Sequence, residues 1–221
     1  TRKEFKDISL ILKDVSLDRP VQLKFSAEVD KNPLTLEGTV GPVGSGFEKG
    51  AVPLDLSLKA LKQLEMKLKG NLENPATTPG VDIDLTVEKF SPRDIVAALG
   101  QTFPVETADP KALDSFALKV HIKADANRAS ISNGVIDLDQ SQLNFSATAS
   151  QFSRPNLKFD LNLDKIDLDR YRPPPSDQPS AEKAPAKGQK QKTDYTPLRR
   201  LILDGLIKIG QLTISKANIQ D

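Results

Sequence analysis

The stretch Leu157-Lys158-Phe159-Asp160-Leu161-Asn162-Leu163 alternates apolar and polar residues without a break. Successive side chains of an extended strand point to opposite sides, so Leu157, Phe159 and Leu161 share one side of such a strand. A period of two residues is typical of a strand with one face in water and one face away from it. The stretch therefore predicts a β-strand with one apolar face.

The same alternation recurs along most of the chain. Turn residues separate the alternating segments, for example Asp18-Arg19-Pro20, Asn74-Pro75 and Thr78-Pro79-Gly80. Short strands that follow one another in this way favour antiparallel neighbours. We expect a mostly β protein with about ten strands, arranged as one elongated, curved antiparallel sheet with one or two short helices.

Two regions depart from the strand pattern. Residues 91–100 begin with Ser91 and Pro92 and end with Gly100, which predicts a short helix with an N-cap. Residues 173–195 are rich in Pro, Lys, Ala and Gln, which predicts a disordered linker or loop. The expected organisation is a β-rich module over residues 1–172, this linker, and strands within residues 196–221 that complete the sheet, after one helical turn at residues 196–200.

The alternation slips by one residue at four places. Two polar residues separate the apolar ones at Lys13-Asp14, Glu88-Lys89, Asp164-Lys165 and Gly210-Gln211. A one-residue slip would turn the following apolar side chains to the other face. Our hypothesis is that β-bulges or bends correct the slip and curl the sheet, so that the apolar face becomes concave.

Composition excludes several classes of function. The 31 Lys and Arg residues balance 30 Asp and Glu residues, which does not favour binding to nucleic acid. The chain has no Cys and therefore no disulfide, thiolate zinc site or Cys nucleophile. No apolar run is long enough to span a membrane as a helix. The chain starts at Thr1 without a leader, and we expect it to be a piece of a longer protein.

No catalytic motif emerges, and we predict a protein that is not an enzyme and holds no metal or cofactor. His121 is the only histidine and lies on the polar side of its strand, where we expect an exposed residue without catalytic partners. The pairs Asp82/Asp84, Asp137/Asp139 and Asp167/Asp169 are expected to be solvated surface charge. Residues 41–46 contain three glycines but lack the Lys-Ser/Thr that completes a phosphate-binding loop.

Several blocks follow one another along the chain, namely residues 33–41 followed by 53–58, residues 152–159 leading into 166–171, and residues 198–212 after a Pro-rich gap. Together they resemble the AsmA family of Gram-negative envelope proteins. The order of the blocks and the ending Asp169-Arg170-Tyr171-Arg172-Pro173-Pro174 carry the resemblance, which extends over almost the whole chain.

The resemblance implies a periplasmic module, tethered to the inner membrane by an N-terminal anchor that is missing here. TamB-like and bridge-like lipid transfer proteins are related, so the expected ligand is a phospholipid or another acyl lipid held in an aliphatic groove. The expected role is lipid transport between the two membranes and outer-membrane homeostasis, with envelope proteins as further partners. Two alternatives stay open: a structural or assembly factor for outer-membrane biogenesis, and a closed β-sandwich interaction module.

The residues expected to line the lipid groove share the apolar side of their strands. They are Leu23, Phe25, Leu36, Leu56, Leu58, Met66, Leu68, Ile83, Leu85, Leu118, Val120, Phe145, Phe159 and Leu161.

Overall fold

A computed structural model describes residues 4–44, 46–47, 49–152, 155–174, 202–214 and 217–220. Its strands are β1 (Phe5–Lys13), β2 (Val21–Val29), β3 (Asn32–Val40), β4 (Ala51–Ala60), β5 (Leu64–Glu73), β6 (Gly80–Phe90), β7 (Phe116–Ala124), β8 (Arg128–Leu138), β9 (Ser141–Ser150), β10 (Asn156–Asp167), β11 (Ile202–Ile214) and β12 (Ala217–Gln220). The helical elements are α1 (Pro92–Ala98) and the 3₁₀ helix η1 (Leu168–Tyr171).

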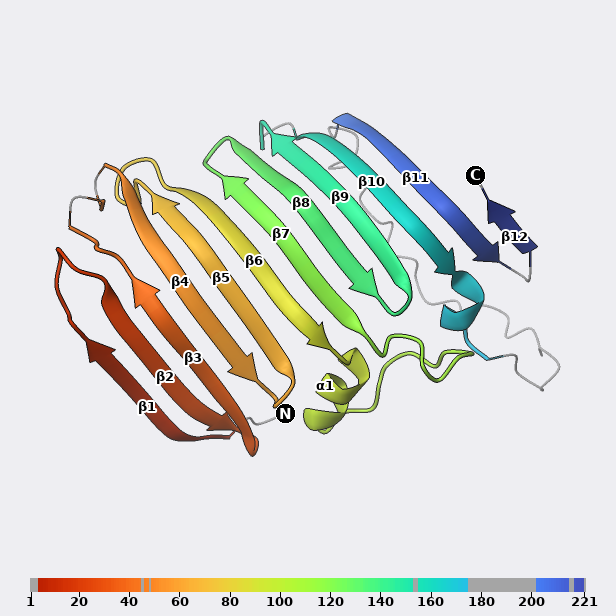
Figure 1. Ribbon diagram of the computed structural model, residues 1–221, viewed down its shortest axis with the longest axis horizontal. Coiled ribbons are helices and arrows are strands. Elements are labelled where there is room, and N and C mark those ends of the chain that lie inside the picture. The colour runs from red at the N-terminus through yellow and green to blue at the C-terminus, as the bar shows by residue number, and fades with distance from the viewer. Residues whose placement is uncertain are drawn as a thin grey trace, which may run out of the picture.

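All twelve strands belong to one sheet, and their order in space is their order in the chain (Figure 1). The sheet is open and curved, which confirms the predicted fold class. A closed β-sandwich, one of the alternatives, is wrong for the described residues because they contain no second sheet. With strands about 4.8 Å apart, the sheet is about 50 Å wide.

One pair of strands departs from the antiparallel pattern. β10 and β11 run parallel, with Leu157 opposite Leu203 and Leu163 opposite Ile209. Alternation along a strand does not reveal the direction of its neighbour, so this parallel pair could not be predicted from the sequence. Most of the predicted linker at residues 173–195, and the helical turn expected at residues 196–200, lie outside the described residues.

Tight turns join the first strands into hairpins. Asp30 and Lys31 both have positive φ (48° and 67°), and so do Leu61 and Lys62 (52° and 63°). Two consecutive residues in the left-handed region are typical of the turns that match the twist of a hairpin. The first turn contains Asp30 and is followed by Asn32 and Pro33, which are typical turn residues. The turn at Leu61-Lys62 has no Gly or Asn and was not predicted.

One of the four predicted slips, in β6, is a β-bulge. β6 has an extra residue between Val87 and Phe90 relative to β7, which is a bulge at Glu88-Lys89. β10 and β11 lack a pair at Asp164 and Gly210 but keep the same register on both sides. The fourth slip, at Lys13-Asp14, lies at the end of β1.

Two further bulges were not predicted. In β1 the register shifts between Lys6 and Ser9, and Asp7 between them has a φ of 49°. In β8 the register shifts around Asn133, whose φ is 52°. Asn and Asp tolerate the left-handed region better than other non-glycine residues, which explains their use at these bulges.

Helix α1 starts as the sequence predicts. The hydroxyl of the N-cap Ser91 accepts a hydrogen bond from the Asp94 N–H at 3.2 Å, and Pro92 opens the helix. The helix ends at Ala98, and Gly100 follows with a φ of 69°. Residues 99–115 then run along one end of the sheet from α1 to β7 (Figure 1).

Candidate functional site: the apolar face of the sheet

The apolar side chains form rows that cross the sheet from strand to strand. Residues directly opposite each other on neighbouring strands point to the same face. The central row runs through eleven strands without a polar residue and consists of Leu10, Phe25, Leu36, Leu58, Met66, Val87, Leu118, Ile136, Leu143, Leu163 and Ile209. We call the side that carries this row the apolar face and the opposite side the polar face.

Two more rows run parallel to the central row on the apolar face, both on the same side of it and one beyond the other. One contains Leu12, Leu23, Gly38, Leu56, Leu68, Leu85 and Val120, and continues after the β8 bulge as Gly134, Phe145, Leu161 and Ile207. The other contains Val21, Val40, Leu54, Gly70, Ile83, Ile122, Ile131, Ala147, Phe159 and Gly205. None of the three rows contains a charged residue.

All fourteen residues named as groove candidates lie in these three rows. Their contact with lipid stays a prediction. Residues that complete the central row, such as Val87, Ile136 and Leu163, were not among the candidates. Ile136 belongs to β8, whose bulge breaks the alternation; the dipeptide Asn133-Gly134 is the signal that could have revealed it.

Two glycines of the rows are covered by phenylalanine rings. A Cβ at Gly134 would lie 2.7 Å from the Phe145 ring, and a Cβ at Gly205 would lie 2.3 Å from the Phe159 ring. Phe145 is opposite Gly134, and Phe159 is opposite Gly205. The rings fill the space left by the missing side chains, so the apolar surface stays continuous.

The apolar face has no layer packed over it in the described part of the molecule. No large side chain there is less than 2% exposed, and the few buried apolar residues include Val87 (7% exposed) and Val120 (8%). The other apolar residues of these rows in β2–β10 are mostly half-buried, because neighbouring side chains shield one another across the strands. A broad aliphatic surface is therefore open to a ligand of low polarity.

The polar face carries pairs of opposite charge between neighbouring strands. Lys67 on β5 lies 3.1 Å from Glu88 on β6, and Lys123 on β7 lies 2.7 Å from Asp82 on β6. The hydrogen bond that Lys123 donates lowers the pKa of Asp82, and the hydrogen bond that Lys67 donates to Glu88 raises the pKa of Lys67. These pairs keep the polar face hydrated, and exposed pairs of this kind contribute little to stability.

His121 lies on the polar face as predicted, but it is half-buried rather than exposed and contacts two carboxylates. Its Nδ1 is 2.9 Å from a carboxylate oxygen of Asp84, and its Nε2 is 3.2 Å from a carboxylate oxygen of Asp82. Asp84 is the residue opposite His121 on β6, so strand register brings the group together. Within the described ranges, no group of three or more His, Cys, Asp or Glu side chains is arranged to hold a metal ion.

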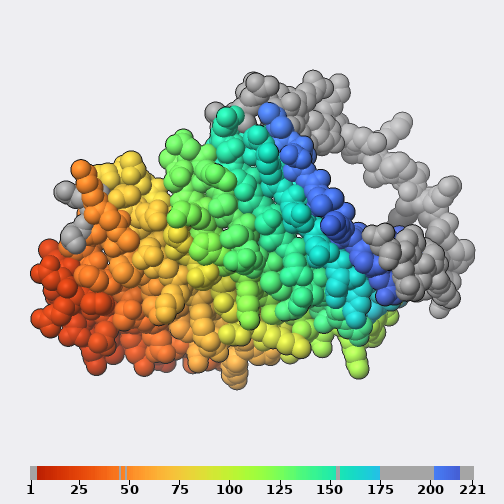
Figure 2. Space-filling view, turned by 45° about the horizontal axis from the view of Figure 1, so that its top comes forward, coloured from red at the N-terminus to blue at the C-terminus, as the bar shows by residue number. Residues whose placement is uncertain are grey.

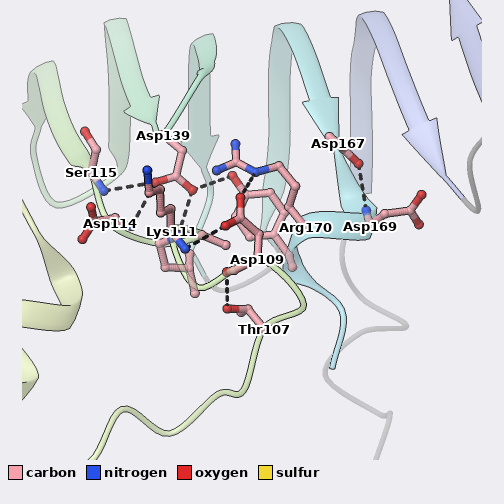
Figure 3. A network of polar contacts seen from close by, with 12 residues as sticks. Thr107, Asp109, Lys111, Asp114, Ser115, Asp139, Asp167, Asp169 and Arg170 are labelled. Atoms are coloured by element: carbon pink, nitrogen blue, oxygen red, sulfur yellow. Dashed lines mark hydrogen bonds and ion pairs between the residues drawn. The ribbon is translucent and has the colours of Figure 1, made fainter. Parts of the chain in front are cut away.

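A polar network at one end of the sheet ties residues 107–115 to the ends of β8 and β10 (Figure 3). Asp139, in the turn between β8 and β9, accepts hydrogen bonds from the N–H groups of Leu113 (2.8 Å), Asp114 (2.9 Å) and Ser115 (3.1 Å). It also accepts one from the Tyr171 hydroxyl at 2.9 Å. Asp139 was expected to be solvated surface charge. This is wrong because its carboxylate accepts hydrogen bonds from these four donors.

Further contacts join η1 to the same loop. The Arg170 Nε donates to Asp109 at 2.7 Å, and the Asp109 N–H donates to the Arg170 carbonyl at 3.2 Å. Arg93 of α1 donates to the Ala112 carbonyl at 2.7 Å and to Thr107 at 2.6 Å. Ala112 is fully buried. Helix α1, the loop and η1 therefore form one connected cap at this end of the sheet.

Burial alone would raise the pKa of Asp139, but the Leu113 N–H, the Tyr171 hydroxyl and the other two amides outweigh it and lower the pKa. Replacing Asp139 with alanine leaves three backbone N–H groups without this acceptor. We expect a loss of about 2 kcal/mol of stability and a melting temperature lower by about 6 °C. Asp137→Ala in the neighbouring strand β8, where the residue is exposed, is the control in thermal unfolding followed by circular dichroism. Equal shifts for the two variants would contradict the role given to Asp139.

Burial and the hydrogen bond to Asp139 raise the pKa of Tyr171 from 10.0 to about 12. Since the folded protein favours the neutral phenol, this contribution to stability is complete below pH 10 and is lost as the pH rises through about 12. The chain has two tyrosines and no tryptophan, so Tyr195→Phe leaves Tyr171 as the only phenol. We expect its absorbance at alkaline pH to titrate near 12 in the folded variant and at a lower pH after Asp139→Ala, which removes the hydrogen bond and the negative charge but not the burial of the phenol. A midpoint near 10 in both proteins would show that Tyr171 is not held in this network.

No helix in the described part of the chain is long and apolar enough to cross a membrane. No family model, no curated protein and no solved structure matches this chain. The resemblance to the AsmA family therefore stays a prediction from the quoted sequence blocks.

Proposed function

We propose that this chain is a non-enzymatic module that holds the acyl chains of phospholipids along its apolar face. The observation that carries the proposal is the central row, which crosses eleven strands without a polar residue and has no described layer over it. Its setting would be the periplasm of a Gram-negative cell, where an AsmA-like protein tethered to the inner membrane supplies lipid to the outer membrane.

The physical chemistry of acyl chains supports this function. Each CH₂ group removed from water contributes about 0.8 kcal/mol, and the contribution does not depend on direction. A surface of Leu, Ile, Val and Met side chains therefore favours acyl chains at many positions along the sheet, without a specific polar site. The paired charges of the polar face keep the opposite side of the same sheet in water.

A second candidate function has one observation in its favour. An assembly factor for outer-membrane proteins needs a sheet edge that accepts strands, and β1 presents such an edge because all nine of its residues are exposed. This observation concerns the edge of the sheet rather than its apolar face.

The lipid proposal can be tested with a tryptophan probe, since the chain has no tryptophan of its own. Phe145→Trp places the probe on the apolar face, and Asn144→Trp places it on the neighbouring residue of the same strand, on the polar face. Phospholipid with brominated acyl chains should quench the first probe and leave the second unchanged. Equal quenching of both probes, or quenching of neither, would refute acyl-chain binding on the apolar face. Phospholipid in an organic extract of the purified protein would give independent support.

A further inference from the structure

Three neighbouring loops at one end of the sheet are held together by their backbones. They are residues 14–20 between β1 and β2, residues 41–50 between β3 and β4, and residues 74–79 between β5 and β6. The Gly44 N–H donates to the Leu17 carbonyl at 2.7 Å, and the Ala76 N–H donates to the Phe47 carbonyl at 3.0 Å. We call these three loops the loop cluster, which lies on the left of Figures 1 and 2, in colours from red to yellow.

Large apolar side chains of the loop cluster are exposed to water. Val15 is 73% exposed, Leu17 is 68% exposed and Phe47 is 50% exposed. Hairpin tips at the opposite end of the sheet carry Asp30-Lys31 and Asp139-Gln140 instead. Single exposed apolar residues are common on protein surfaces. Three of them on loops that are bonded to one another indicate a surface for a partner of low polarity.

The charges of the loop cluster do not select a charged partner. Its sequence contains two positive and three negative side chains, namely Arg19, Lys49, Asp14, Asp18 and Glu48. This near balance offers no complementary field to an acidic or a basic partner. Attraction to the cluster must therefore come from the burial of apolar side chains.

The backbone of the loop cluster is prepared for an environment with little water. A polar backbone group that enters the boundary of a bilayer needs a partner within the protein. The bonds of Gly44 to Leu17 and of Ala76 to Phe47 supply such partners, and the Asn74 N–H adds a bond to the Gly50 carbonyl at 2.7 Å. Apolar side chains on a segment of this kind can enter the boundary between headgroups and acyl chains while nearby charges stay among the headgroups.

The loop cluster borders the apolar face. Val21 directly follows the first loop, and Val40 directly precedes the second. These two valines are opposite each other and belong to the row that lies farthest from the central row. A bilayer in contact with the loop cluster would therefore lie next to the apolar rows.

We propose that the loop cluster docks on the surface of a phospholipid bilayer, with Val15, Leu17 and Phe47 in the boundary between headgroups and acyl chains. The attraction comes from apolar burial and does not depend on the charge of the lipid. Docking turns this end of the apolar rows toward the membrane, so that acyl chains enter the module here. The entry of acyl chains rests on the function proposed above, whereas the docking does not.

Flotation of the whole chain with vesicles of neutral phosphatidylcholine tests the docking. We expect binding that changes less than about twofold when salt is raised to about 0.5 M, because salt does not screen apolar burial. Leu17→Asp together with Phe47→Asp should weaken binding by at least about tenfold. The matched control, Leu99→Asp together with Val105→Asp, adds two charges at exposed apolar residues of the opposite end and should change binding less than about twofold. Circular dichroism checks that both double variants are folded.

A tryptophan probe locates the contact, since the chain has no tryptophan of its own. Vesicle phospholipid brominated close to its headgroup should quench Phe47→Trp and leave Val105→Trp unchanged. Two further measurements separate docking from lipid binding on the apolar face. Leu56→Asp with Leu85→Asp interrupts a row of that face and should leave flotation unchanged. Leu17→Asp with Phe47→Asp should still bind fluorescent phospholipid supplied as monomers.

Four results would overturn the proposal. The first is a wild-type chain that does not float with neutral vesicles, and the second is an equal loss of flotation in the variant and its matched control. The third is flotation that is lost when the apolar face is interrupted but not when the loops are changed, which would make that face the contact. The fourth is a doubled mass that Leu17→Asp with Phe47→Asp abolishes, without flotation of the wild type, which would make a second copy the occupant. Binding of monomeric phospholipid is measured separately, so each of these results would leave the function proposed for the apolar face untouched.

Discussion

A variant carrying Leu56→Asp and Leu85→Asp is expected to lose bound phospholipid while keeping its fold. Both leucines lie in one row of the apolar face, on β4 and β6, with β5 between them. Two carboxylates at these positions bring water to the middle of the row. Contact with an acyl chain does not offset the free-energy cost of removing that water from the carboxylates. We expect binding of acyl lipid to fall by at least about tenfold, measured by titration with a fluorescent phospholipid.

The matched control uses the next residue of each strand. Ser57→Asp and Thr86→Asp add the same two charges to the polar face, where both residues lie opposite Lys67. Lipid binding should be unchanged in this control, and circular dichroism should show a folded sheet for both double variants. Loss of binding in the control as well would mean that net charge, rather than the apolar face, decides lipid binding.

Replacing Gly70 with alanine is expected to cause the largest loss of stability of any single substitution considered for this sheet. Gly70 lies inside β5 with a φ of 150°, and a Cβ there would lie 2.1 Å from the Asp82 carbonyl oxygen and 2.6 Å from the Ile83 Cα. The contacts are with the backbone of β6, which cannot move without losing its pairing with β5. The expected cost is about 4 kcal/mol, which lowers the melting temperature by about 10 °C.

Gly100→Ala is the control for this substitution. Gly100 also has a positive φ (69°), but nothing lies within 4 Å of the position of its missing Cβ. The control should therefore lose only about 1 kcal/mol, from backbone strain alone. Urea unfolding of both variants measures the difference, and equal losses would show that the close approach of β5 and β6 is unimportant.

The apolar face could be predicted from the sequence because alternation alone fixes which side chains share a side. Leu56, Leu68 and Leu85 lie on consecutive strands, and each was placed correctly without knowledge of the pairing. The same regularity predicted the bulge of β6, since Glu88 and Lys89 interrupt it. A row across the sheet depends on which side chains of each strand share a face and on the register between neighbouring strands. The alternation of the sequence predicts the first but not the second.

Features that depend on contacts between distant segments could not be predicted. Three of the four donors to Asp139 are backbone N–H groups. Every residue except proline has such a group, so the residue types do not reveal which ones bind Asp139. His121 meets Asp82 and Asp84 through the register of β6 and β7. Strand β8 was missed because the bulge at Asn133 breaks its alternation, so Ile131 and Ile136 fall out of phase.

The sequential order of the strands has a consequence for folding. From β1 to β10 each strand pairs with its neighbours in the chain, so most ladders close over short distances and can form one after another. The parallel ladder of β10 and β11 instead joins Asn156 to Ile202, and the entropy of closing this longer loop opposes its formation. A single-layer sheet of this kind behaves as a one-dimensional array, in which stability is a sum of nearest-neighbour terms and unfolding begins at the ends. The β10–β11 ladder, close to one end of the sheet, is then expected to form late on folding and to be lost early when the protein is heated.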